Sequence, residues 1–496
     1  YDYKGIYLLE LNGRYDGSSR FPAGDKWAFF PSGSIGYRFS QEAYWDKLRE
    51  TVSNGKLRFS YGEIGNENVG SSWPYIATIG TISASYVGWL NGSNAKVNEF
   101  DLPEWVSSSL TWERIKTIDI GLDLGLLNDM VTVGFDWYQR TTNDMIAPGK
   151  ALPPSVGAST PTTNSGSLRT RGWELTINWR KQFTNDLGLY ANFSIGDSKS
   201  VVTKWDNDQN IGHPLNTAYA YAGQVWGDIW GFETDRYFTE ADFTGKNADG
   251  SWIYAPGVAD QTGIQTQTFV YGPGDIKFKD LDGSGVIDGG KGTVDDHGDL
   301  KVIGNCLPRY EYSFHIGGTY KGFDLDLFFQ GVGKRDMWTQ SSFVFPEMRE
   351  ADLAIYANQT SYNIYEPEKG IVNISESNAF PCLYPGNEYA GNVTGLAGEG
   401  GCHNYYPQTK YLVDMSYLRL KNVTLGYTLP VELTKKAFVQ KLRFYVSCNN
   451  LFLLHKGSGD LPIDPEMNAG QGALGYTWGR TYPTTKSWSF GLQVTF

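Results

Sequence analysis

Alternation of apolar and polar side chains with a period of two is the feature that most constrains this chain. Residues 173–180 read WELTINWR, and the runs at 118–126 and 131–138 follow the same pattern. A period of two gives a β-strand one apolar and one polar face. Similar runs lie near 3–15, 33–41, 56–65, 187–198, 309–320, 322–332, 416–429, 440–451 and 486–496. The pattern predicts an all-β chain of about twelve strands, most of about 9–14 residues.

The lengths of the strands and of their connections point to a membrane. Globular strands usually have about 5–6 residues, whereas a strand that crosses a bilayer at a tilt needs about 9–11. Short and long connections alternate along the chain. The short ones lie near 127–130, 182–187 and 320–323, and two modest ones, at 41–56 and 429–440, have room for a helical turn. The long connections are 15–33, 65–112, 141–171, 198–309, 332–416 and 451–486. Outer-membrane barrels alternate in this way, so the sequence predicts a transmembrane antiparallel β-barrel with short periplasmic turns and long extracellular loops.

Charge and hydropathy exclude other classes. The net charge is −12, which argues against a nucleic-acid partner. The mean hydropathy is −0.38, and no run of 18 apolar residues occurs, so transmembrane helices are not expected. In the last segment, 487–496, aromatic and aliphatic residues alternate with Ser, Gly, Gln and Thr. We expect the apolar faces of the strands to meet lipid, with Trp137, Trp173, Trp179, Tyr312 and Phe496 on that outer face.

Several segments carry a family resemblance. They are DGSSRF (16–21), FPSGSIGYRF (30–39), GDIKFKDLDGSGVID (274–288), the run from 302 to 336 that begins VIGNCLPRYEYSF, SYLRLKNVTLGYTLP (416–430) and LRFYVSCNNLF (442–452). In this order they resemble the C-terminal half of SusC/RagA-type TonB-dependent transporters. The resemblance implies a barrel of about 22 strands closed by an N-terminal plug. Residues 1–496 would then be the later part of that barrel. The chain starts within a strand pattern, so we expect the plug, the TonB-engaging motif and the earlier strands to lie outside it.

The resemblance also implies a function. Such a transporter would import glycan fragments or oligopeptides across the cell outer membrane, powered through TonB. Its partners would be a SusD-like surface lipoprotein that acts as a lid, the remaining N-terminal half of the transporter and outer-membrane lipid. No enzyme activity is expected, because none of the five histidines lies in an HExxH or Ser-His-Asp context. The alternative is a soluble secreted carbohydrate-binding or carbohydrate-cleaving β-protein, which strand length and the alternating connections disfavour.

One loop has the spacing of a calcium site. Residues 279–291 read KDLDGSGVIDGGK. The side chains or carbonyls that match positions 1, 3, 5, 7 and 9 of an EF-hand loop are Asp280, Asp282, Ser284, Val286 and Asp288. Lys291 stands where a bidentate Glu belongs, and Asp295 or Asp296 could replace it. A turn built from Asp-Gly and Ser-Gly dipeptides needs no metal, so both interpretations stand.

Aromatic and cysteine residues leave further alternatives. Aromatic side chains gather in the long connections: Tyr219, Tyr221, Trp226, Trp230, Trp252, Tyr254, Tyr405, Tyr406 and Tyr411. They could stack on sugars, but packing is the favoured interpretation, and no substrate residue is assigned. Cys382 and Cys402 are compatible with a disulfide or with two free thiols. Cys448 lies in a strand pattern and is expected to be a small buried residue.

Overall fold

The structure is a computed structural model of the chain. It describes residues 1–69, 73–82, 90, 93, 95–96, 98–150, 152–156, 160–206, 210–212, 215–216, 219–248, 250–265, 270–338, 344–345, 356–383, 403–466 and 482–496. In this described part, no helix has the length and apolar character needed to cross a membrane.

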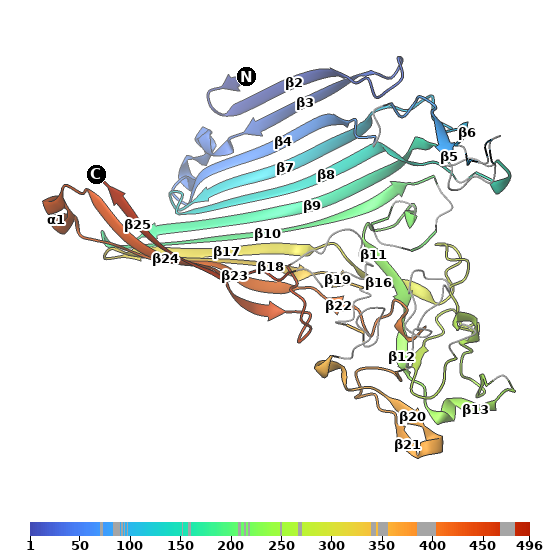
Figure 1. The fold of residues 1–496 in the computed structure, drawn as a ribbon. Helices are drawn as coiled ribbons and strands as arrows, with labels where there is room; N and C mark the ends of the chain where they lie inside the picture. Colours follow the sequence, from blue (N-terminus) through green and yellow to red (C-terminus); the bar gives the residue numbers. More distant parts are fainter. Residues whose placement is uncertain are drawn as a thin grey trace. The chain divides into compact units, whose positions relative to one another are not determined.

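A single large antiparallel sheet organises the chain, and its strands are paired in sequence order (Figure 1). Thirteen strands of the described residues form it: β1 (Asp2–Tyr3), β2 (Tyr7–Gly17), β3 (Trp27–Tyr37), β4 (Val52–Asn66), β7 (Glu113–Leu126), β8 (Val131–Pro148), β9 (Thr162–Gln182), β10 (Leu187–Lys204), β17 (Arg309–Tyr320), β18 (Phe323–Lys334), β23 (Tyr417–Thr428), β24 (Lys441–Lys456) and β25 (Ser487–Thr495). Apart from the two-residue β1, these are the twelve predicted strands. The prediction of long antiparallel strands is confirmed.

The chain divides into two compact units. The first comprises residues 1–174, 198–209 and 220–225, and the second comprises 175–197, 210–219 and 226–496. In the first unit, cross-strand pairing places Leu9 beside Ile35, Ile35 beside Phe59, Phe59 beside Ile120 and Ile120 beside Trp137. The first four of these side chains are exposed. This row of apolar side chains therefore forms a solvent-accessible face of the sheet, as expected for a surface that meets lipid.

The second unit repeats the pattern. Phe490 of β25 pairs with Val446, Val446 with Leu425, and Leu425 with Leu325. Along β25 the side chains at 488, 490, 492 and 494 are all large, apolar and exposed, and so is Phe496 just after it. None of the five residues expected on the outer face is among the buried core side chains. Among the residues that the structure describes, no second sheet packs on this apolar face, which agrees with the barrel fold.

Connections alternate as predicted within each unit. In the second unit, β17 and β18 are joined by residues 321–322, and β23 and β24 by 429–440, which contains the one-turn helix α1 (Val431–Thr434). The connections 205–308 and 335–416 join β10 to β17 and β18 to β23. Because neighbouring strands are antiparallel, both long connections start from strand ends on one side of the sheet, and the short connections join strand ends on the opposite side. In the first unit, the modest connection between β3 and β4 contains the expected helical turn, Ala43–Leu48, and a second one at Phe39–Gln41 that was not expected.

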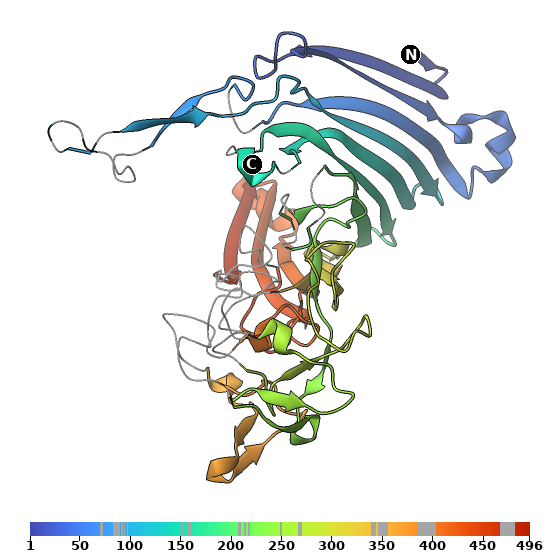
Figure 2. The same ribbon diagram turned by 90° about the vertical axis from the view of Figure 1, so that its right-hand side faces the viewer.

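The long connections contain their own small sheets and cores. The two-stranded ladders are β5 (Ile79–Ile82) with β6 (Glu99–Pro103), β11 (Asp228–Phe232) with β16 (Leu300–Asn305), β12 (Thr234–Tyr237) with β15 (Ile276–Phe278), β13 (Phe243–Lys246) with β14 (Trp252–Tyr254), β19 (Asp336–Met337) with β22 (Val413–Asp414), and β20 (Ile364–Glu366) with β21 (Ile371–Asn373). In Figure 2 the β5–β6 hairpin of the first unit extends away from strands β4 and β7, which it connects. The same unit also contains a buried cluster formed by Phe21, Ala28, Phe30, Leu110 and Trp112.

Short 3₁₀ turns complete the described elements: Pro154–Val156, Glu240–Asp242, Thr262–Ile264, Ala357–Gln359, Pro367–Lys369, His403–Tyr405 and Lys435–Ala437.

Candidate functional site

The face of the sheet opposite the apolar one carries charged networks. In the second unit, Asp324 on β18 is paired with Arg443 on β24, with 2.9 Å between Arg443 Nε and Asp324 Oδ1. Two residues further along β18, Asp326 lies 2.6 Å from His315 Nε2 and accepts a hydrogen bond from the Tyr190 hydroxyl. Charged side chains on one face and apolar side chains on the other are what a barrel wall between lumen and lipid requires.

The first unit has a similar network around one guanidinium. Arg58 on β4 contacts Asp123 at 2.8 Å and Asp136 at 2.9 Å, and Asp119 lies 4.0 Å away. A Cβ at Gly121, which sits beneath this cluster, would lie 2.5 Å from Arg58 Cζ. Gly121 therefore leaves the space that the guanidinium occupies. These residues were not among the sites predicted from the sequence, because Arg58 and its carboxylate partners lie on three different strands.

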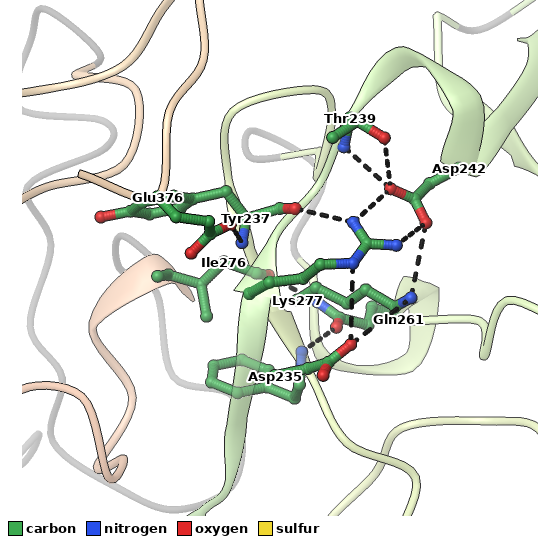
Figure 3. Close-up of polar contacts among 10 residues, drawn as sticks. Asp235, Tyr237, Thr239, Asp242, Gln261, Ile276, Lys277 and Glu376 are labelled. Atoms are coloured by element: carbon green, nitrogen blue, oxygen red, sulfur yellow. Dashed lines mark hydrogen bonds and ion pairs between the residues drawn. The ribbon is translucent and has the colours of Figure 1, made fainter. Parts of the chain in front are cut away.

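An ion pair with a buried carboxylate organises the connection 205–308 (Figure 3). Arg236 on β12 donates two hydrogen bonds to Asp242, at 2.7 and 2.6 Å, and the backbone N–H and hydroxyl of Thr239 donate two more to it. Asp242 is 3 % exposed. Burial alone would raise the pKa of its carboxyl, but the bonds from Arg236 and Thr239 outweigh burial and hold that pKa well below its usual range.

Further side-chain hydrogen bonds reach the backbone of the β12–β15 ladder. The Gln261 side chain donates to the Ile276 carbonyl and accepts from the Phe278 N–H, and Glu376 accepts the Tyr237 N–H at 2.7 Å (Figure 3). Burial raises the pKa of the Tyr237 hydroxyl to about 12. This loop region is therefore a packed fold of its own rather than an irregular coil.

A pocket of about 690 Å³ opens in this part of the second unit. Its lining comes from β13, β14, β20, β21 and the segments beside them: Lys246, Gly250, Trp252, Val270, Gly272, Pro273, Tyr362, Asn363, Ile364, Tyr365, Glu366, Ile371, Cys382 and Leu383. Aromatic rings, aliphatic side chains and a few polar groups are the usual composition of ligand pockets.

The acidic loop gathers three carboxylates. Oxygens of Asp280, Asp282 and Asp299 lie within 4.8 Å of one another. The fully buried Asp299 was not among the expected ligands, although it lies at the end of the same acidic stretch. Burial raises its pKa, against the two backbone N–H groups of Leu281 and Asp288 that donate to it. Three oxygen donors of this kind suit a hard cation such as Ca²⁺.

Expected ligand atoms also take part in hydrogen bonds within the loop. Asp280 accepts the N–H groups of Gly283 and Gly285, and Asp288 accepts that of Gly290. The Ser284 hydroxyl donates to the Val286 carbonyl at 2.9 Å. The loop thus satisfies its own polar groups, as a turn would, and the calcium site stays a prediction.

The aromatic side chains of the long connections mostly pack. Trp230, Tyr221, Tyr405, Tyr406 and Tyr411 are buried, as the packing interpretation expects. Trp252 differs, because it lines the pocket.

The thiols are buried where the structure describes them. Cys382, Cys306 and Cys448 are buried free thiols, and Cys448 matches its expectation. Cys402, the other half of the suggested disulfide, lies outside the described residues.

One serine meets both a histidine and an aspartate. The Ser416 hydroxyl lies 3.0 Å from His455 Nε2 and 3.0 Å from Asp414 Oδ2. In a hydrolytic triad the carboxylate orients the imidazole, whereas here it binds the hydroxyl itself. The arrangement is a hydrogen-bonded link between strand ends, not an activated nucleophile.

Comparisons with known proteins agree with this architecture. A family described as TonB dependent receptor-like, beta-barrel matches residues 1–295. TonB-dependent receptor P3 of Formosa agariphila is 28% identical over 100% of this chain and 44% of its own length, and TonB-dependent receptor SusC of Bacteroides thetaiotaomicron is 26% identical over 99% and 42%. The chain therefore spans less than half the length of these curated relatives.

A solved structure gives the same fold. The RagAB peptide transporter structure matches with a TM-score of 0.66 and 22% identity, over 100% of this chain and 46% of that chain. The long amphipathic strands, the alternating connections and the family match over more than half of the residues lead to one conclusion. The chain belongs to the TonB dependent receptor-like β-barrel family and is a β-barrel protein of the outer membrane.

Proposed function

We propose that the chain supplies the later part of the barrel wall and much of the extracellular loop surface of a TonB-dependent importer of glycan fragments or oligopeptides. The observation that carries the proposal is the sheet itself. Its exposed apolar face suits lipid, its other face carries ion pairs such as Arg443–Asp324, and its long connections fold at one edge. The plug, the TonB-engaging motif and the earlier strands would belong to the rest of the transporter.

The names of similar proteins support the proposed substrate class and lid. A structurally similar protein is named a peptide transporter, and a relative is named SusC. We infer a SusD-like surface lipoprotein that covers the loop side and opens to admit substrate. A lid that stays attached while it opens needs a large interface, of roughly 2,000 Å² or more.

Uptake by intact cells tests this function. A strain that lacks the transporter should lose growth on one member of a panel of glycans and oligopeptides, and the restored gene should recover it only when TonB is present. Affinity purification of the tagged transporter in mild detergent should recover a surface lipoprotein. Uptake that continues without TonB would contradict active import.

The alternative, a soluble carbohydrate-binding or carbohydrate-cleaving protein, is disfavoured by the apolar side chains exposed along β25 and on β2 to β4. Extraction separates the two proposals. A barrel stays in the membrane fraction until detergent is added, whereas the secreted protein would be found in the culture medium.

A further inference from the structure

The pocket of about 690 Å³ is a candidate binding site that the barrel function does not require. All its lining residues lie within the second unit, between Lys246 and Leu383. Its volume falls within the range of about 300–1,000 Å³ that small-molecule sites occupy. The pocket is therefore large enough to take one part of a larger substrate.

Flat aromatic surfaces form part of its wall. The rings of Trp252 and Tyr365 lie 6.0 Å apart at 59°, and Tyr362 also lines the pocket. A Cβ at Gly272 would lie 2.6 Å from Trp252 Nε1, so the Gly lets the indole lie against this wall. A sugar ring has an apolar C–H face and a hydroxyl rim. It suits a corner made of ring faces with polar groups beside them better than a rod-shaped aliphatic side chain does.

One lysine is the cation of the pocket lining, and outside the lining the Glu240 carboxylate accepts a hydrogen bond from the Tyr365 hydroxyl at 3.1 Å. The two charged lining residues are Lys246 and Glu366, and Glu366 is paired with Lys369 at 3.1 Å. The ammonium of Lys246 lies 4.3 Å from the centre of the Trp252 ring, and among the residues that the structure describes no carboxylate forms an ion pair with it. An exposed cation–π contact is weak, so this lysine can turn towards an anionic ligand at little cost.

We propose that this pocket binds an acidic saccharide, with a pyranose ring against Trp252 and Tyr365 and a uronate carboxylate paired with Lys246. The inference rests on the proposed import function and narrows its substrate class. It gives the pocket the task of holding one sugar unit at the loop surface, and no covalent step is involved.

Equilibrium binding to the purified transporter in detergent tests the proposal. The probes are a glucuronate-containing disaccharide, the matching neutral glucose disaccharide and an uncharged tetrapeptide. We expect the acidic disaccharide to bind more tightly than the neutral one. Lys246→Gln should weaken the acidic probe about tenfold while the neutral probe changes less than about twofold, because one charge-assisted contact is lost. Trp252→Ala should weaken the binding of both disaccharides.

Controls separate the pocket from its surroundings. Lys291→Gln removes an exposed lysine that is absent from the lining and should change nothing. Lys246→Glu, at an exposed position, should reverse the preference without unfolding the loop. Equal binding of the acidic and neutral sugars, or tighter binding of the tetrapeptide, would overturn the proposal.

The outcomes also separate this inference from the import function. Binding needs neither TonB nor a membrane potential. TonB-dependent uptake with no sugar binding at the pocket refutes the pocket alone. Sugar binding without uptake supports the pocket and refutes import.

Discussion

At the scale of single residues, Asp242 shows how the long connection between β10 and β17 is stabilised. Four donors from Arg236 and Thr239 surround its buried carboxylate, and Lys277 lies 3.4 Å away. Asp242→Asn should destabilise this loop fold by about 2 kcal/mol, because hydrogen bonds to a charged group are lost and Arg236 and Lys277 keep only their longer contacts with Asp235. Asp235→Asn is the matched control, since Asp235 is half-exposed and lies 3.9 Å from Arg236. Urea unfolding followed by tryptophan fluorescence measures the difference, and equal effects would contradict the role of Asp242.

The same residue predicts a pH dependence. An aspartate in the unfolded chain titrates near about 3.9, and the pKa of Asp242 in the folded chain is lower. The stability that it contributes is therefore complete above that unfolded value and is lost as pH falls towards the folded pKa. With Asp242→Asn, the free energy of unfolding of the loop should change less between about pH 4 and pH 2 than it does in the parent chain. Unfolding curves at several acid pH values check this slope.

Residue-scale features divide into those that sequence could predict and those that it could not. The burial of Cys448 followed from its place in an apolar alternation. The cluster around Arg58 joins three strands, and its partners lie 61 to 78 positions away in the chain, so no local pattern indicates it. Likewise Asp299 reaches the Asp280 turn only because the intervening segment folds back.

At the scale of elements, β25 offers the clearest test of the two faces. Phe490 is 83 % exposed on the apolar face, and the neighbouring Ser489 lies on the other face, paired with Ser447. Phe490→Lys should cost about 2–4 kcal/mol if it lies at the bilayer midplane, because a charge would enter lipid. Ser489→Lys should cost much less. Reversible unfolding of the complete transporter in lipid vesicles measures both, and similar costs would argue against a lipid-facing Phe490.

Limited proteolysis of the acidic loop tests whether its carboxylate cluster binds calcium. If Asp280, Asp282 and Asp299 hold Ca²⁺, adding the ion should slow proteolysis of residues 279–300, and a chelator should reverse the protection. Asp299→Asn should abolish the response, and Asp235→Asn, which alters a half-exposed residue outside the cluster and outside the expected ligands, should keep it. Identical cleavage with Ca²⁺ and with chelator would leave a turn held only by its backbone hydrogen bonds.

Elements were predictable wherever a periodic pattern marked them. The twelve long strands follow from alternation, and the helical turns at 43–48 and 431–434 were expected because the two modest connections had room for them. The ladders inside the long connections were not predicted. β14 and β20 have three residues each, too few for a period, and the pocket wall to which they contribute depends on pairings such as Tyr365 with Val372.

At the scale of the whole molecule, the open question is how the sheet closes. In the described residues β25 pairs only with β24, and the order of the sheet runs from β1 to β25 without a closing pair. Unpaired backbone groups at a strand edge cost several kcal/mol each in lipid. The chain covers 44% of TonB-dependent receptor P3, so the relatives have further chain that could supply closing strands.

Refolding into vesicles tests this closure. Residues 1–496 alone should not fold, because both edge strands of the sheet would face lipid with unpaired backbone groups. Their mobility on gels should then be the same with and without heating, and they should stay sensitive to protease. Refolding together with a separately expressed remainder of the transporter should give a compact, heat-modifiable and protease-resistant species. The apolar variant Phe490→Lys should reduce its yield, and the polar-face variant Ser489→Lys should not. A heat-modifiable barrel from residues 1–496 alone would show that the sheet closes on itself, and would contradict its proposed place as one part of a larger barrel.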